Sequence, residues 1–164
     1  MNWQFNSFAQ TDLGLVRDGN EDSAISAPNL IAVADGMGGH AGGEVASAIA
    51  INALARLLPI LSDNNVDLES KTDLFLNITH EIDNQIDQIS KEKPELSGMG
   101  TTLTALCILD TSIELLHIGD SRCYRYRENK LEQLSNDHTV MQELLDQGRS
   151  VSYTHLTLPT KRIV

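Results

Sequence analysis

Three acidic residues in the first part of the chain have a spacing that suits a metal site. Glu21 and Asp22 end a short polar segment, and Asp35 directly follows a continuous apolar run. That run predicts a buried strand, which would hold Asp35 at a fixed place where Glu21 and Asp22 could meet it across an adjacent strand. Gly36 has no side chain, so its carbonyl can turn toward a hard cation. Mg²⁺ and Mn²⁺ prefer such oxygen ligands and keep several waters.

The same cluster indicates what chemistry the ions would serve. Carboxylates this close repel each other unless cations lie between them. Two metal ions about 4 Å apart can activate a water and clamp a phosphoryl group. Arg17 lies four residues before Glu21. Its planar guanidinium can bind a phosphate through two parallel N–H groups. Each residue alone is typical of an ordinary turn or surface charge, and only the cluster favours a site.

A second polar cluster lies further along the chain. It comprises the glycine-rich segment 98–102 and the segment 117–122, in which Asp120 follows a predicted strand and a glycine. This placement suits a further metal ligand. It also suits a residue that accepts a hydrogen bond from a metal ligand. A tight turn in which Asp120 caps its own backbone would have the same sequence.

Two other metal or nucleotide motifs fail on their spacing. Asp18-x-Asn20-x-Asp22 imitates the start of a calcium-binding EF-hand loop, but Ser23 and Asn29 occupy the positions that need glycine and glutamate. Gly36-x-Gly38 resembles a dinucleotide-binding turn. Asp35 directly before it would repel a pyrophosphate, and no second strand ends in an acid about 20 residues on.

The cysteines exclude a cysteine-based phosphatase. Such a loop needs an arginine six residues after the nucleophile, whereas Cys107 is followed at that distance by Ile113 and Cys123 by Asn129. Both cysteines lie in apolar or alternating sequence, and two cannot build a disulfide framework. We expect reduced, buried thiols.

The pattern of apolar residues predicts the elements that position these clusters. It predicts an antiparallel α+β fold rather than alternating βαβ units. The expected strands span 5–14, 29–34 (buried on both faces), 101–109, 113–118, 122–127 and 131–134. The expected helices run from residue 43 to Pro59 or the 62–65 cluster, from about 70 to 90, and from 139 to 147.

Composition excludes some classes of partner. The chain has 164 residues, with 12 Lys and Arg against 23 Asp and Glu, and a net charge of −11. An acidic protein is a poor nonspecific binder of nucleic acid. Much of the excess lies on the polar face of the second expected helix. No basic region precedes an apolar stretch at the N-terminus, and no apolar run approaches the roughly 20 residues that span a bilayer. We expect a cytoplasmic monomer.

Five segments in order resemble the metal-dependent Ser/Thr protein phosphatases of type 2C, the PPM family, in its bacterial branch and especially its actinobacterial enzymes. The segments are Arg17–Asp22, Ala34–His40 with Gly43–Ser47, Gly98–Thr102, His117–Arg122 and Asn136–Thr139. The resemblance implies an antiparallel β-sandwich flanked by helix pairs. It also implies hydrolysis of phosphoserine and phosphothreonine in proteins, the substrates of Ser/Thr kinases, by a metal-bridged water.

The resemblance also implies roles for particular residues. Arg17 would bind the phosphate. Glu21, Asp35 and the Gly36 carbonyl would hold one Mn²⁺ or Mg²⁺, with Asp35 bridging to a second ion. Asp22 would support them, and Asp120 would contribute to a third ion. His40 is a candidate proton donor to the leaving oxygen, with packing or hydrogen bonding as the equal alternative. His80, His117 and His138 are expected to be structural.

The last residues depart from the family. After Gly148-Arg149 the family continues with two more metal-ligand aspartates, which have no counterpart here. We therefore expect residues 1–149 to be the N-terminal part of a PPM-type domain, incomplete at its C-terminus. Residues 150–164 would be a foreign or disordered tail, with an edge strand as an alternative. An incomplete site leaves a second hypothesis open, a noncatalytic module that binds phosphopeptide or metal without turnover.

Overall fold

A computed structural model describes residues 3–16, 18–39, 41–137 and 152–157. Its centre is an antiparallel sheet in the order β1-β2-β4-β5-β8, with β3 also paired to β2. The strands are β1 Asp22–Ser26, β2 Leu30–Met37, β3 Gly100–Thr101, β4 Leu103–Leu109, β5 Ser112–Ile118 and β8 Ser152–Thr157. The predicted α+β class with antiparallel strands is confirmed, and it excludes the parallel sheet of dinucleotide-binding folds.

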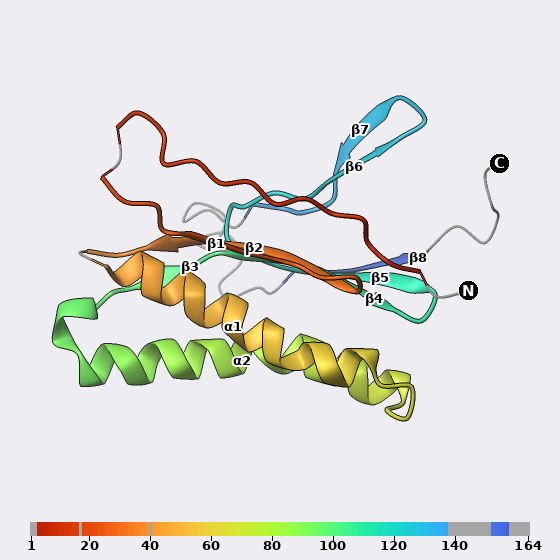
Figure 1. Cartoon of the computed structure of the whole chain (residues 1–164), viewed down its shortest axis with the longest axis horizontal. Helices are drawn as coiled ribbons and strands as arrows, with labels where there is room; N and C mark the ends of the chain where they lie inside the picture. The colour runs from red at the N-terminus through yellow and green to blue at the C-terminus, as the bar shows by residue number, and fades with distance from the viewer. Residues whose placement is uncertain (1–2, 17, 40, 138–151, 158–164) are drawn as a thin grey trace.

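Two long helices cover one face of the sheet, and the N-terminal segment and a hairpin lie over the other (Figure 1). Helix α1 spans Gly42–Ser62 and helix α2 spans Leu68–Glu92, followed by a short 3₁₀ helix, η1, at Pro94–Leu96. The hairpin consists of β6 Tyr124–Arg127 and β7 Lys130–Gln133. Glu128 and Asn129 both have positive φ at its turn (51° and 60°), the geometry that suits a two-residue hairpin.

Helix α1 is apolar because it packs between the sheet and α2. Ala50, Ala53 and Leu54 are fully buried in a core shared with Leu30 of β2 and Phe75 of α2. By length and composition α1 is also the one helix in the described ranges that could cross a membrane, contrary to the expectation that no such stretch exists. Its buried contacts account for its apolarity in this fold.

The helix ends agree closely with the sequence pattern. Of the two ends predicted for α1, the later one is confirmed, because Pro59 lies inside the last turn and the helix continues to Ser62. A proline there removes only one intrahelical hydrogen bond. Helix α2 begins two residues before the predicted start, after an N-cap at Asp67 that accepts a hydrogen bond from the Ser70 amide at 2.9 Å.

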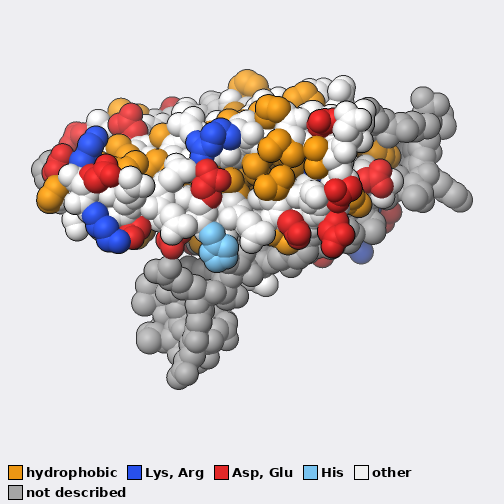
Figure 2. Space-filling view, turned by 90° about the horizontal axis from the view of Figure 1, so that it is seen from below, with side chains coloured by type: hydrophobic (Ala, Val, Ile, Leu, Met, Phe, Trp, Pro, Cys, Tyr) orange, Lys and Arg blue, Asp and Glu red, His pale blue; other side chains and the backbone are white. Residues whose placement is uncertain are grey.

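Carboxylates on the outside of α2 account for much of the acidic excess, as predicted. Asp73, Glu81, Asp83 and Asp87 are all exposed. Figure 2 looks onto this helical side of the molecule and shows acidic side chains scattered among basic and apolar ones. These acids therefore need no ligand to explain them.

The prediction that the strand over 29–34 is buried on both faces is wrong. Residues of β2 alternate between buried and more accessible positions, and Val33 is 48% exposed. The helices cover only the face that carries Leu30, Ala32 and Ala34. An unbroken apolar run cannot distinguish this arrangement from burial on both sides.

The predicted strand over 5–14 is also wrong. Those residues form no ladder, although the Phe5 amide donates to the Pro28 carbonyl at 2.6 Å. The first strand is instead β1, whose sequence Asp-Ser-Ala-Ile-Ser has little of the aliphatic content that predicts a strand. The predicted helix over 139–147 lies outside the described residues. In the tail, 152–157 form β8 at the sheet edge, and the boundary at residue 149 stays a prediction.

Candidate metal centre

The two aspartates of the predicted cluster face each other across adjacent strands. Asp22 begins β1, Asp35 lies near the end of β2, and the two are direct partners in the antiparallel register. Partners in such a pair point to the same side of the sheet. Both are exposed on the side away from the helices. The expectation that acids of the polar loop meet Asp35 across neighbouring strands is confirmed for Asp22, whereas Glu21 is not part of this pair.

All the described candidate ligands line one cavity of about 480 Å³, here called the acidic cavity. Its lining residues include Glu21, Asp22, Asp35 and Asp120 together with Gly36. Asp12 of the N-terminal segment adds a fifth carboxylate, which the sequence patterns did not single out. Among the described residues, no lysine or arginine lines this cavity. The cavity therefore concentrates negative charge, and Arg122 lines an adjoining hollow together with Asp22 and Asp35.

Glu21 lies on the other side of β1, against the first turn of α1. A Cβ atom built on Gly43 would lie 2.2 Å from Glu21 Oε2, and one on Gly36 would lie 2.0 Å from the Gly43 carbonyl oxygen. These distances mean that β2 and α1 touch through bare backbone, which only glycine permits. The Glu21 carboxylate is thus fixed near a helix N-terminus, where the helix dipole favours negative charge.

Hydrogen bonds order the loop around Asp22. The Asp22 amide donates to Asn20 Oδ1 at 3.0 Å, and Asn20 Nδ2 donates to Thr11 Oγ1 at 2.6 Å. Thr11 Oγ1 lies 3.3 Å from Asp22 Oδ2, to which it donates. The N-terminal segment is therefore tied to the polar loop, and this explains why Asp12 reaches the acidic cavity.

Thr102 links the two halves of the site; it belongs to the predicted cluster of residues 98–102, but no individual role was predicted for it. Its Oγ1 accepts from the Asp35 amide at 3.0 Å, and its own amide donates to the Asp35 carbonyl at 2.9 Å. The same Oγ1 lies 2.7 Å from Ser121 Oγ, next to Asp120. A threonine between two strands has no local signal that would reveal such distant contacts.

The loop that carries Asp120 depends on a glycine. Gly119 has a φ of 98°, in the region that favours glycine, and a Cβ there would lie 2.7 Å from Thr102 Cγ2. This sharp bend at the end of β5 leaves Asp120 exposed at the wall of the acidic cavity. Both of the predicted clusters therefore contribute to one site.

The donor set fits a hard divalent cation in chemistry. Carboxylates and a free carbonyl are the ligands that Mg²⁺ and Mn²⁺ accept, and these ions commonly keep waters between themselves and part of the protein. Within the described residues, however, no three Asp, Glu, His or Cys side chains are gathered closely enough to hold an ion by themselves. The carboxylates line the walls of the cavity rather than forming a closed ligand cluster, so ions here would retain water. Arg17 and His40 lie outside the described residues.

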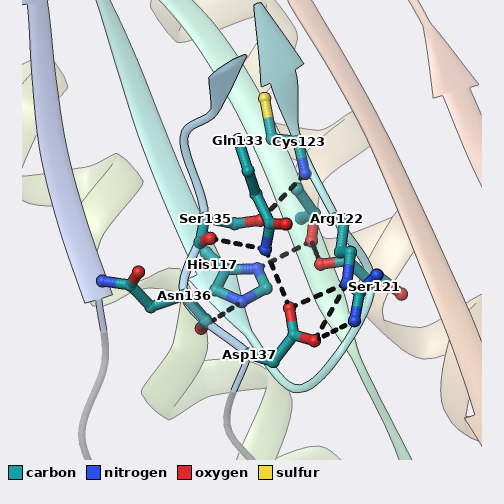
Figure 3. Close-up of polar contacts among 9 residues, drawn as sticks. His117, Ser121, Arg122, Cys123, Gln133, Ser135, Asn136 and Asp137 are labelled. Atoms are coloured by element: carbon teal, nitrogen blue, oxygen red, sulfur yellow. Dashed lines mark hydrogen bonds and ion pairs between the residues drawn. The ribbon is translucent and has the colours of Figure 1, made fainter. Parts of the chain in front are cut away.

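A second polar network lies beside the site (Figure 3). Asp137 accepts from Arg122 Nε at 2.9 Å and from Gln133 Nε2 at 3.1 Å. The hydrogen bonds from Arg122 hold the pKa of the Asp137 carboxyl below its usual range. His117 is fully buried and bonded on both ring nitrogens, which is consistent with its expected structural role. His80 is exposed, and His138 lies outside the described residues.

The two cysteines are free and buried, as predicted. Burial raises the pKa of the Cys107 thiol to about 12, and it also raises the pKa of the Cys123 thiol. Neither thiol would form the thiolate needed for nucleophilic catalysis near neutral pH. The structure thus agrees with the exclusion of a cysteine-based phosphatase.

Comparisons with known proteins single out one family. The family model described as protein phosphatase 2C matches residues 18–156. This range includes the described candidate ligands Glu21, Asp22, Asp35, Gly36 and Asp120. It extends beyond residue 149.

Two curated relatives cover most of this chain. The chain is 45% identical over 142 residues to the serine/threonine protein phosphatase PstP of Mycobacterium tuberculosis, across 86% of this chain and 26% of PstP. It is 34% identical over 160 residues to the serine/threonine phosphatase stp of Listeria welshimeri, across 94% of this chain and 63% of stp. The chain therefore spans about a quarter of PstP and less than two thirds of stp.

A solved structure shares the fold. The crystal structure of the catalytic domain of PstP in complex with two manganese ions superposes with a TM-score of 0.77 at 37% identity. The match covers 92% of this chain and 71% of that domain. The antiparallel sheet and its helix pair are therefore those of a protein whose structure is known with metal bound.

Proposed function

The chain belongs to the protein phosphatase 2C family, and from this premise we propose that its acidic cavity serves metal-dependent hydrolysis of phosphoserine and phosphothreonine in proteins. One observation carries the proposal. The four acids and the glycine that the sequence singled out, and that the structure describes, line a single cavity with no described basic residue. These carboxylates would repel a phosphate unless cations lay between them, because like charges repel.

Divalent cations bound there would supply the positive charge that a phosphate needs beside these carboxylates, and would activate water for attack on phosphorus. Asp35 is the central ligand in this proposal because both its backbone amide and its carbonyl are held by Thr102. Asp22 faces it across the strands, and Glu21 and the Gly36 carbonyl approach from the side of α1. Mn²⁺ is the first ion to test, since PstP has been crystallised with it.

We propose the roles of Arg17, His40 and Asp120, and the partners and location of the protein, on the same basis. Arg17 would bind the substrate phosphate. His40 would donate a proton to the leaving oxygen, unless it serves packing. Asp120 would hold a third ion. The expected partners are protein substrates of Ser/Thr kinases. The free buried thiols support a location in the reducing cytoplasm. We propose that the chain acts as a monomer.

The test is phosphate release from p-nitrophenyl phosphate and from a phosphothreonine peptide, with Mn²⁺ present and with a chelator. We expect hydrolysis that depends on Mn²⁺ and whose rate falls at least about 100-fold in Asp35→Asn. Loss of a residue that only hydrogen-bonds to a metal ligand typically costs about 10- to 100-fold, and loss of a ligand itself should cost more. Asp73→Asn is the matched control, because Asp73 is an exposed aspartate on α2 far from the cavity in the fold.

Three outcomes separate the hypotheses. Hydrolysis that needs Mn²⁺ and Asp35 supports the proposed function. Binding of Mn²⁺ without any hydrolysis favours the noncatalytic module instead. Full activity in Asp35→Asn would overturn the assignment of the acidic cavity as the catalytic site.

A further inference from the structure

The loop that carries Asp120 is held to the sheet by hydrogen bonds with two threonines, Thr102 and Thr104. Ser121 follows Asp120, and its carbonyl accepts from Thr104 Oγ1 at 3.1 Å. Its hydroxyl lies 2.7 Å from Thr102 Oγ1. Thr102 lies between β3 and β4, and Thr104 lies in β4. Two threonines therefore hold the carbonyl and the hydroxyl of Ser121.

Thr104 is in turn held by a buried histidine. His117 of β5 is the register partner of Thr104, it is 0% exposed, and its Nδ1 lies 2.9 Å from Thr104 Oγ1. Its Nε2 lies 3.0 Å from the Asn136 carbonyl oxygen. Figure 3 shows the imidazole between the Asn136 side of the network and the Ser121–Cys123 segment.

Counting hydrogens shows how closely these groups depend on each other. A carbonyl only accepts, so Nε2 carries a hydrogen toward Asn136. The single hydroxyl hydrogen of Thr104 is needed for the Ser121 carbonyl. Thr104 Oγ1 also lies within hydrogen-bond distance of Nδ1, so the same oxygen joins the loop to the buried ring.

We propose that Thr104 and His117 are positioning residues that hold the loop of residues 119–122 on the sheet and so keep Asp120 at the acidic cavity. The inference rests on the proposed function, since it treats Asp120 as a metal ligand. It goes further in assigning a role to two residues that touch neither metal nor substrate. His117 acts through Thr104, and Thr104 acts through the Ser121 carbonyl.

The test measures the loop directly and the metal separately. Thr104→Val removes the hydroxyl at nearly constant volume. In the metal-free protein it should speed amide hydrogen exchange at residues 119–122 about 10-fold or more. It should also weaken Mn²⁺ binding in a calorimetric titration by about 10-fold or more. Losses of this size are typical when a residue that hydrogen-bonds to a metal ligand is removed from a metalloprotein. Thr104→Ser, which keeps the hydroxyl, should restore both.

Two controls separate positioning from general destabilisation. Ser112→Ala removes a buried hydroxyl from the other end of β5, where Ser112 donates to the Leu109 carbonyl at 3.0 Å. It should lower the midpoint of thermal unfolding without changing loop exchange or Mn²⁺ affinity. Adding His117→Asn to Thr104→Val should have no further effect on the loop, because both act on one chain of contacts.

The outcomes are distinguishable. Unchanged exchange at residues 119–122 in Thr104→Val would overturn the positioning role, whatever the metal does. Equal loss of Mn²⁺ affinity in Ser112→Ala would overturn it too. If the wild-type chain binds no Mn²⁺, the proposed function fails, while the exchange rates still decide whether Thr104 and His117 order the loop.

Discussion

At the scale of single residues, the site places two carboxylates of like charge directly opposite each other. Asp22 and Asp35 are direct partners across β1 and β2, and like charges in that relation oppose pairing of the strands. Thr11 and Asn20 order the Asp22 loop but carry no charge to offset it. Facing carboxylates of this kind indicate a function that needs their negative charge.

This arrangement predicts that removing one charge stabilises the metal-free protein. Asp22→Asn should raise the free energy of unfolding by about 0.5 kcal/mol, the size of a cross-strand pair contribution. Urea unfolding with a chelator present measures it. Adding Mn²⁺ should reverse the order, so that the wild-type chain becomes the more stable. A variant less stable than wild type without metal would contradict the idea of repulsion.

At the scale of elements, the position of α1 on β2 fixes the geometry of the site. Gly36 and Gly43 let the two backbones meet, and Glu21 fills the space beside them. The glycine-rich turn was predicted, but the contact was not, because a close approach of backbones depends on segments distant in the sequence. The same limit applies to Thr102, which bonds to Asp35 across 67 positions.

Gly36→Ala should therefore destabilise the fold severely. Its Cβ would lie 2.0 Å from a backbone oxygen that cannot rotate away, so the helix must shift. We expect a loss of about 3 kcal/mol, at the upper end for overpacked sites. Gly39→Ala is the control, since a Cβ there meets nothing within 4 Å. Equal stability of the two variants in urea unfolding would rule out the close contact.

The N-cap of α2 makes stability depend on pH. Hydrogen bonds from Ser70 hold the pKa of the Asp67 carboxyl below its ordinary value. A group with a depressed pKa in the folded state stabilises the fold above its unfolded pKa, and that contribution disappears as the pH falls through its folded pKa. Asp67→Asn keeps a good cap without the titration. Its unfolding midpoint should therefore fall less steeply than that of wild type below about pH 4.

At the scale of the whole molecule, one sheet carries the core on one face and the site at one end. The two long helices and the positions of strands β4 to β7 could be predicted because their apolar residues recur with clear periods. Strand β1 could not, because its polar residues are placed by pairing with β2 rather than by their own preference. The acids of the site were found from their density, whereas Asp12 and Thr102 reach it only through tertiary contacts.

The account of α1 as a core helix can be tested within the same helix. Leu54 is 0% exposed, whereas Ile60 is 36% exposed. Leu54→Ala should cost about 3 kcal/mol of unfolding free energy, and Ile60→Ala much less. Urea unfolding in buffer without lipid is the measurement. Similar small losses in both would mean that α1 does not pack as described.

The most direct test of the central claim is a calorimetric Mn²⁺ titration of the wild-type chain beside Asp35→Asn, with Asp73→Asn as control. We expect saturable binding in wild type and in Asp73→Asn. The affinity should be at least about 100-fold weaker in Asp35→Asn, because loss of a ligand should cost more than loss of a residue that only hydrogen-bonds to one. Equal binding in all three proteins, or none in wild type, would contradict the claim that the acidic cavity is a metal centre.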